Sequence, residues 1–88
     1  MAKVILKLDC KDVINETVTN EVFNKFIKSA QGKIDFIKRT KEDYPEIFNR
    51  KWLDIRQTED LFILKGNTYG FSQEWINTFK TMFQEANN

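Results

Sequence analysis

Three carboxylates around the single proline of the chain are the first candidates for chemistry. Glu42, Asp43 and Glu46 flank Pro45. Paired carboxylates perform general acid and base work on sugars or phosphates when their surroundings push their pKa values apart. Charged residues in an exposed turn are more often solvent contacts. We therefore expect these three side chains to be solvated, and a carboxylate enzyme remains an alternative that requires a cleft at this position.

Other catalytic groups are scarce in this sequence. The chain has no histidine, which removes the most common general base and the usual zinc ligand. The single cysteine, Cys10, continues the apolar side of an alternating stretch, so we expect a small buried side chain rather than a nucleophile. The three glycines form no phosphate-binding loop, and no Asp-rich loop has calcium spacing. The sequence thus predicts no catalytic residue, no metal site and no cofactor.

Two short basic clusters lie in the middle of the chain, close to aromatic residues. Such clusters can contact phosphates while neighbouring rings stack on bases. Carboxylates between them dilute the positive field, so a mixed solvated surface is the competing interpretation. The candidate nucleic-acid-binding residues are Lys38, Arg39, Lys41, Arg50 and Lys51.

Aromatic residues are abundant, with eight Phe, two Trp and two Tyr in 88 residues. Each ring buries roughly 150 to 250 Å², so a few are enough to anchor a small core. Rings that remain outside the core are favoured anchors at protein interfaces. Five aromatic residues are out of phase with the expected core or lie in or next to expected loops, and packing in the core is the competing interpretation for them. These are the candidates for contact with a protein partner: Phe36, Tyr44, Trp52, Tyr69 and Phe71.

Length and composition indicate one folded domain that spans residues 1–88. Hydrophobic residues make up 41% of the chain and charged residues 31%, which is typical of a globular protein. The net charge of +1 is too small to attract the whole protein to polyanions or membranes. We expect a cytoplasmic protein, because no signal peptide or membrane-spanning segment is recognisable. Abundant Lys, Ile, Asn and Phe resemble the usage of AT-rich genomes, including many bacteriophages, for which the host cytoplasm would be the compartment.

Three stretches predict strands. Residues 3–10 and 52–57 alternate between apolar and polar side chains, and residues 61–64 are apolar on both faces, which favours a central position. Residues 58–60 join the last two strands closely enough for a hairpin. Residues 11–19 indicate a polar connection.

Two apolar stripes with helical spacing predict the main helices. Thr19 caps the first helix, which we expect to run unbroken to about residue 40. Gly32 is its weak point, because a mid-helix glycine costs about 1 kcal/mol relative to alanine, and two helices hinged there are the alternative. Pro45 opens a short helical turn over residues 45–49, and Ser72 caps the last helix.

The predicted architecture is α+β, with a small three-stranded sheet and two main helices packed on one face, in the order β-α-(short helix)-β-β-α. This order is similar to that of a KH-type RNA-binding domain. The Gly-x-x-Gly loop with which a KH domain grips nucleic acid is absent, because Gly32 is the only glycine in that region. Residues 3–10 or 52–57 must form a sheet edge, where two copies could pair as a homodimer, although Lys3 and Lys7 blunt the first of these strands.

These observations favour a small non-catalytic module that binds a protein partner, such as a phage or mobile-element regulator that inhibits a host protein by covering its surface. The alternative is a KH-like RNA- or DNA-binding protein that uses the basic residues at 38–51. Binding to nucleic acid would weaken steeply with rising salt concentration, whereas binding to a protein partner would depend on salt much less.

Overall fold

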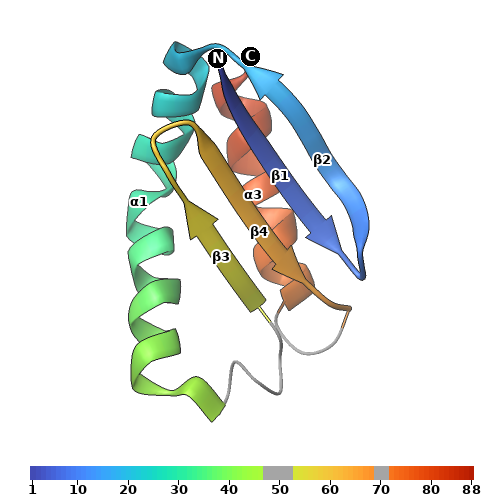
Figure 1. Ribbon diagram of the computed structural model, residues 1–88, viewed down its shortest axis with the longest axis vertical. Coiled ribbons are helices and arrows are strands. Elements are labelled where there is room, and N and C mark those ends of the chain that lie inside the picture. The colour runs from blue at the N-terminus through green and yellow to red at the C-terminus, as the bar shows by residue number, and fades with distance from the viewer. Residues whose placement is uncertain (47–52, 69–71) are drawn as a thin grey trace.

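The computed structural model describes residues 1–46, 53–68 and 72–88. A four-stranded sheet is covered on one face by two helices (Figure 1). The elements in chain order are β1 (Ala2–Leu8), β2 (Lys11–Val18), α1 (Asn20–Asp43), β3 (Leu53–Gln57), β4 (Leu61–Gly66) and α3 (Ser72–Ala86). The α+β class is confirmed. Pro45 and Glu46 are helical, and the rest of the predicted short helix lies outside the described residues.

The strands are arranged in the order β2-β1-β4-β3. The two central strands, β1 and β4, are parallel, and each has an antiparallel hairpin partner at its outer side. The predicted hairpin between the last two strands and the central place of β4 are therefore confirmed. β1 is central as well, so Lys3 and Lys7 do not lie on a sheet edge; the edges are β2 and β3.

The predicted count of three strands is wrong, because β2 occupies the stretch that the sequence indicates as a polar connection. The register between β1 and β2 shifts between Leu6 and Lys7. This bulge interrupts the alternation of apolar and polar side chains that would indicate a strand in the sequence. Within β2, Ile14 and Val18 are buried, and most of the other side chains are exposed, as at a sheet edge. With β2 included, the order of elements is no longer the one on which the similarity to a KH domain rests.

Asp9 and Cys10 form the turn between β1 and β2. Their φ angles are 52° and 66°, and two positive φ values in succession are the requirement of a type I′ hairpin turn. Asp9 is held by two bonds: its N–H donates to the carbonyl oxygen of Gly66 at 3.0 Å, and its carboxylate accepts from the N–H of Thr68 at 3.2 Å. Cys10 is consequently exposed, and the expectation of a buried cysteine is wrong.

Helix α1 is continuous through Gly32 and ends at Asp43, slightly beyond the predicted end. The Oγ1 atom of Thr19 accepts a hydrogen bond from the N–H of Val22 at 3.2 Å, which confirms the predicted cap. The last helix, α3, begins at Ser72 itself, within one residue of the predicted start. The Thr19 cap therefore locates the start of α1, whereas Ser72 is the first residue of α3 rather than the cap that precedes it.

Gly32→Ala is expected to raise the free energy of unfolding by about 1 kcal/mol, because alanine removes the conformational cost of a glycine inside a helix. A Cβ atom built at Gly32 meets no atom within 4 Å, so no clash opposes the gain. Urea unfolding followed by circular dichroism measures the difference. An unchanged or lower free energy of unfolding would contradict the open surroundings of this position.

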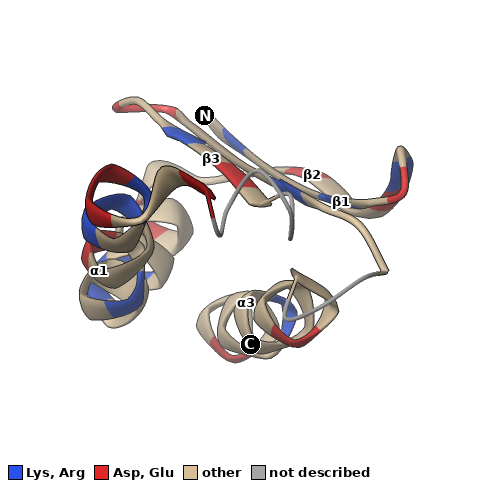
Figure 2. Cartoon of the chain, turned by 90° about the horizontal axis from the view of Figure 1, so that it is seen from below, with Lys and Arg blue, Asp and Glu red and all other residues tan. Residues whose placement is uncertain are grey.

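No described element covers the face of the sheet opposite the helices (Figure 2). Ile5 and Ile63 are paired side by side in the centre of this face and are half-buried. Charged side chains from all four strands surround them at Lys3, Lys7, Asp12, Asp54, Arg56 and Lys65.

Among the described residues, no helix has the length and apolar character that a membrane span requires.

Candidate functional site

A pair of aromatic rings, one exposed and one half-buried, lies where α1 meets α3. Phe36 is 57% exposed, although it is a large apolar residue. Its ring stacks on Trp75 of α3, with centroids 5.9 Å apart and planes inclined by 29°. Trp75 in turn lies against the buried ring of Phe79, at a centroid distance of 6.3 Å. The exposed ring is thereby attached to the core through Trp75.

The two rings border an apolar hollow of about 580 Å³. We call this hollow the interhelix groove; it is lined by Ser29, Gly32, Lys33, Phe36 and Trp75. The α1 residues recur at spacings of three and four, so they form one stripe of that helix. Gly32 leaves the floor open, since a Cβ atom there would meet nothing within 4 Å. The hydroxyl of Ser29 donates a hydrogen bond to the carbonyl oxygen of Phe26 at 3.1 Å, so this donor is already satisfied within the helix.

Lys33 is the charged residue of the interhelix groove. Its Nζ atom lies 6.0 Å from the centre of the Trp75 ring, within reach of a cation–π interaction. In the part of the chain that the structure describes, no carboxylate forms an ion pair with Lys33. Asp35 accepts a hydrogen bond from Gln31 at 2.8 Å instead. An unneutralised positive charge therefore lies at the rim of an apolar hollow.

Two of the five predicted partner-binding aromatic residues lie in the described ranges. Phe36 belongs to the interhelix groove. Tyr44 is 59% exposed at the C-terminal end of α1 and makes no ring contact with another described residue. The other three candidates, Trp52, Tyr69 and Phe71, lie outside the described residues.

Trp75 was not a predicted site residue, because its helical spacing places it on the apolar stripe of α3. Its signal in the sequence is weak: it lies at the margin of that stripe, next to the buried Ile76, and it remains half-buried in the structure. A large ring at the margin of an amphipathic stripe can pack against the core with one part and remain accessible at the surface with another.

The predicted basic cluster is partly engaged in contacts within the protein. Lys41 donates to the carboxylate of Asp54 at 3.1 Å, and Lys38 donates to the side-chain oxygen of Gln57 at 3.4 Å. Both lysines thus reach from α1 to the edge strand β3. Arg39 is exposed, whereas the remaining candidates, Arg50 and Lys51, lie outside the described residues.

The carboxylates near Pro45 are solvated, as expected. Glu42, Asp43 and Glu46 are all exposed, and none of their carboxylates makes a hydrogen bond or ion pair with another described residue. A buried, paired setting of the kind that tunes carboxylates for acid and base catalysis is therefore not formed here by the described residues.

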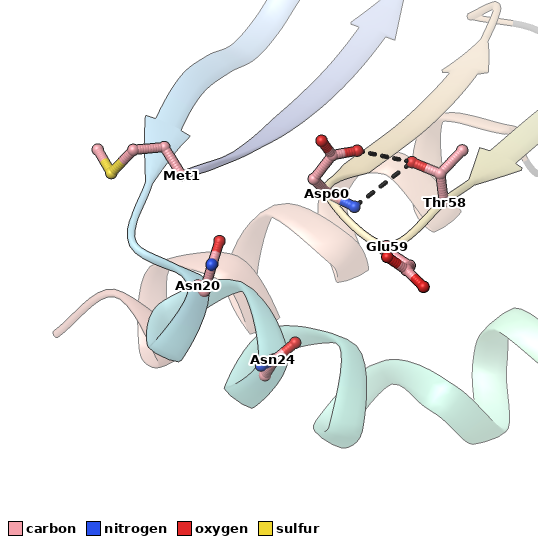
Figure 3. A pocket seen from close by; sticks show the side chains of 6 residues that line it. All are labelled: Met1, Asn20, Asn24, Thr58, Glu59 and Asp60. Atoms are coloured by element: carbon pink, nitrogen blue, oxygen red, sulfur yellow. Dashed lines mark hydrogen bonds between the residues drawn. The ribbon is translucent and has the colours of Figure 1, made fainter.

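A polar hollow of about 560 Å³ lies between the first turn of α1 and the loop that joins β3 to β4 (Figure 3). The hydroxyl of Thr58 donates to the carboxylate of Asp60 at 3.1 Å and accepts from the N–H of Asp60 at 3.4 Å. The N–H of Thr58 also donates to the carbonyl oxygen of Leu61 at 2.8 Å. These bonds close the hairpin, so the polar groups of this loop have a structural role.

Asp12 on β2 titrates abnormally because of its neighbours. A hydrogen bond from the amide of Asn15, at 3.1 Å, lowers the pKa of Asp12, and the nearby ammonium of Lys7 acts in the same direction. A carboxyl whose pKa is lowered in the folded state stabilises the fold above its usual pKa near 3.8 and loses that contribution as the pH falls through the lowered value. Because Asp12 is exposed to solvent, the effect concerns the β1–β2 hairpin rather than catalysis.

Metal-ligating side chains are not grouped in the described ranges, where no three residues among His, Cys, Asp and Glu lie close enough to hold a metal ion. Comparison with known proteins shows no relative, because no family model, no curated protein and no solved structure matches the chain. Among the described features, the interhelix groove combines an exposed aromatic ring, an apolar hollow and a lysine next to a tryptophan ring.

Proposed function

We propose that this protein is a small non-catalytic module that binds another protein through the interhelix groove. The observation that carries the proposal is the exposed ring of Phe36, stacked on Trp75 beside the open space at Gly32. Each Å² of apolar surface withdrawn from water contributes about 25 cal/mol. A partner side chain that fills the hollow would desolvate both rings, and rigid aromatic residues of this kind are common energetic centres of interfaces.

The interhelix groove is formed before any partner arrives, which supports the proposal. Trp75 lies against the buried Phe79, and Phe36 lies against Trp75, so little side-chain freedom remains to be lost on binding. A binding surface with ordered rings loses less conformational entropy than a flexible one. The ordered rings are therefore more typical of a binding surface than of an apolar side chain that is exposed without a function.

Gly32 provides a second argument. A glycine in the middle of a helix costs about 1 kcal/mol of stability relative to alanine. The space above Gly32 is open, so packing inside the fold does not require the absence of a side chain there. A destabilising residue without a structural need is typical of a functional position. We infer that Gly32 keeps the floor of the groove free for a partner.

A module of this kind acts by covering part of its partner. In this proposal the protein is a regulator, such as a phage or mobile-element inhibitor of a host protein in the host cytoplasm. The proposed source draws its support from the AT-rich type of composition, and the proposed mode of action draws its support from the groove.

Nucleic-acid binding is the second candidate function. It is favoured by the exposed Arg39 and by the lysines of the uncovered sheet face, of which Lys3 and Lys65 make no ion pair with another described residue. Lys38 and Lys41 contribute less to it, since both are bonded to β3. Phosphate contacts would make the affinity fall steeply with salt, whereas burial in an apolar groove would not.

Phe36→Ser is expected to weaken binding to the protein partner by about tenfold or more, because truncating a central interface aromatic residue costs at least about 1.4 kcal/mol of binding free energy. Affinity purification from the native host at two salt concentrations identifies the partner, and calorimetric titration with the purified partner measures the Kd. Phe36 is exposed, so the substitution should leave the circular dichroism spectrum unchanged.

Tyr44→Ser is the matched control for this measurement. It removes a ring of nearly equal exposure, 59%, from the end of the same helix but outside the groove, and its Kd should equal that of the wild type. Unchanged binding by Phe36→Ser would rule out the groove as the interface. Loss of binding by Tyr44→Ser instead would move the interface to the C-terminal end of α1. Recovery of nucleic acid alone, released at the higher salt concentration, would favour the second function.

A further inference from the structure

We infer that the partner segment bound in the interhelix groove is acidic, with a bulky apolar side chain over Gly32 and a carboxylate beside it that pairs with Lys33. This inference rests on the proposed function and specifies the chemistry of the partner. It follows from the position of one lysine and from the distribution of charge along the two helices.

Lys33 places its charge where a bound side chain would lie. Its Nζ atom is 6.0 Å from the centre of the Trp75 ring, on the lining of the same hollow. No described carboxylate neutralises it, since the ion pairs of the described residues involve other lysines and Arg56. An apolar anchor in the groove would exclude water from this ammonium group, and a buried charge without a partner is costly. A carboxylate next to the anchor removes that cost.

The α1 wall of the groove carries further positive charge. Lys25 lies two turns before Gly32 on the same stripe, and Lys28 and Arg39 each lie within one turn of a groove residue. One exposed carboxylate, Asp35, lies between Lys28 and Arg39 along α1 and is outnumbered by these three basic residues. All three are exposed, and none forms an ion pair with another described residue. Opposite charge on a partner would increase its association rate and fix its register along α1.

Helix α3 is less positive than α1, with exposed Glu74 and Glu85 and the half-buried Lys80, and Glu74 is next to the groove residue Trp75 in the chain. Carboxylates of the partner are therefore expected on the α1 side, which sets the orientation of the segment across the groove.

A random peptide library displayed on phage tests the inference directly, and it does not require the natural partner. Selection on the wild-type protein should enrich peptides that combine a bulky apolar residue with Asp or Glu within about one helical turn of it. The enriched peptides should not bind Gly32→Leu, whose side chain fills the hollow. Leucine is a good helix former at an exposed position, so this variant should fold.

Charge exchange on a synthetic enriched peptide tests the contact with Lys33. Lys33→Glu should raise the Kd about tenfold, and replacement of the peptide carboxylate by Lys should restore much of the affinity of that variant. Lys28→Glu makes the same change of charge outside the lining, and it should raise the Kd much less and show no such restoration. Equal effects of Lys28→Glu and Lys33→Glu would mean that the peptide is attracted by the overall positive charge of α1. That result would overturn the specific ion pair between Lys33 and the peptide carboxylate.

The possible failures are distinguishable. Enriched peptides that lack acidic residues, but lose binding to Gly32→Leu, would overturn the acidic partner and leave the groove as a binding site. Peptides that bind Gly32→Leu and Phe36→Ser as well as they bind the wild type would contradict the proposed function itself, as would a selection that enriches no sequence.

Discussion

Phe26→Ala is expected to lower the free energy of unfolding by about 3 to 5 kcal/mol, which approaches the whole stability of a domain of this size. Phe26 is fully buried on α1. Its ring meets Phe62 of β4, Phe79 and Phe83 of α3 edge to face, with centroids 5.2, 6.4 and 5.7 Å away. One side chain thus joins both helices to the sheet, and its removal leaves a cavity among all three.

Urea unfolding followed by circular dichroism and tryptophan fluorescence measures this loss. Phe36→Ala is the control, because it makes the same chemical change at an exposed ring of the same helix and should cost less than about 1 kcal/mol. If Phe26→Ala does not fold, Phe26→Leu, which keeps much of the buried volume, should fold with a smaller loss. Equal costs for Phe26→Ala and Phe36→Ala would contradict the arrangement of the core.

Gly66→Val is expected to lower the free energy of unfolding by about 3 kcal/mol, because the last residue of β4 lies directly beneath the start of α3. A Cβ atom at Gly66 would lie 2.9 Å from the Cβ atom of Ser72 and 3.3 Å from the Cδ1 atom of Leu53. The Cβ atom of Ser72 is attached to the backbone and cannot rotate away, so α3 itself would have to move. Gly66→Ala should show a smaller loss of the same sign.

Ser72→Gly provides a check on this cause, since it removes the atom that the new side chain would meet first. In the Ser72→Gly background, Gly66→Val should cost less than it does in the wild type, as a double-mutant cycle of urea unfolding would show. Gly32→Ala is a second control, because the same type of residue lies in open space there and its replacement should be stabilising. A neutral Gly66→Val would mean that the contact between β4 and α3 is loose.

The close contact at Gly66 also bears on the interhelix groove. Ser72 is the first residue of α3, and Trp75 follows within the first turn. The approach of α3 to the end of β4 therefore determines where the Trp75 ring meets Phe36. Gly66→Val should weaken partner binding as well as stability, and Gly66→Ala should do so to a lesser degree.

Local rules predict much of this fold from the sequence. The Thr19 cap and a stripe of apolar residues locate α1, and similar signals locate α3 within one residue. The alternation in β1 and β3 and the doubly apolar β4 identify three strands, because side chains in a strand point alternately to its two faces. These features depend on residues that are close together in the chain, so the sequence carries their signal.

Contacts between distant residues decide the rest. The edge strand β2 buries few side chains, and a bulge disturbs its alternation, so the pairing with β1 identifies it where the pattern does not. The left-handed conformation of Asp9 depends on bonds to Gly66 and Thr68, which lie far along the chain. Cys10, in the same turn, is exposed as a consequence.

The candidate site depends on tertiary structure to the same degree. The sequence singles out Phe36 by its phase on α1, but the stacking partner Trp75 comes from the other helix and has the spacing of a core residue. Only the packing of both helices on one sheet brings these rings together beside Gly32 and leaves Lys33 without an ion pair to a described carboxylate. Amino-acid spacing determines which face of each helix is apolar, whereas the arrangement of the elements determines which part of that face remains open to a partner.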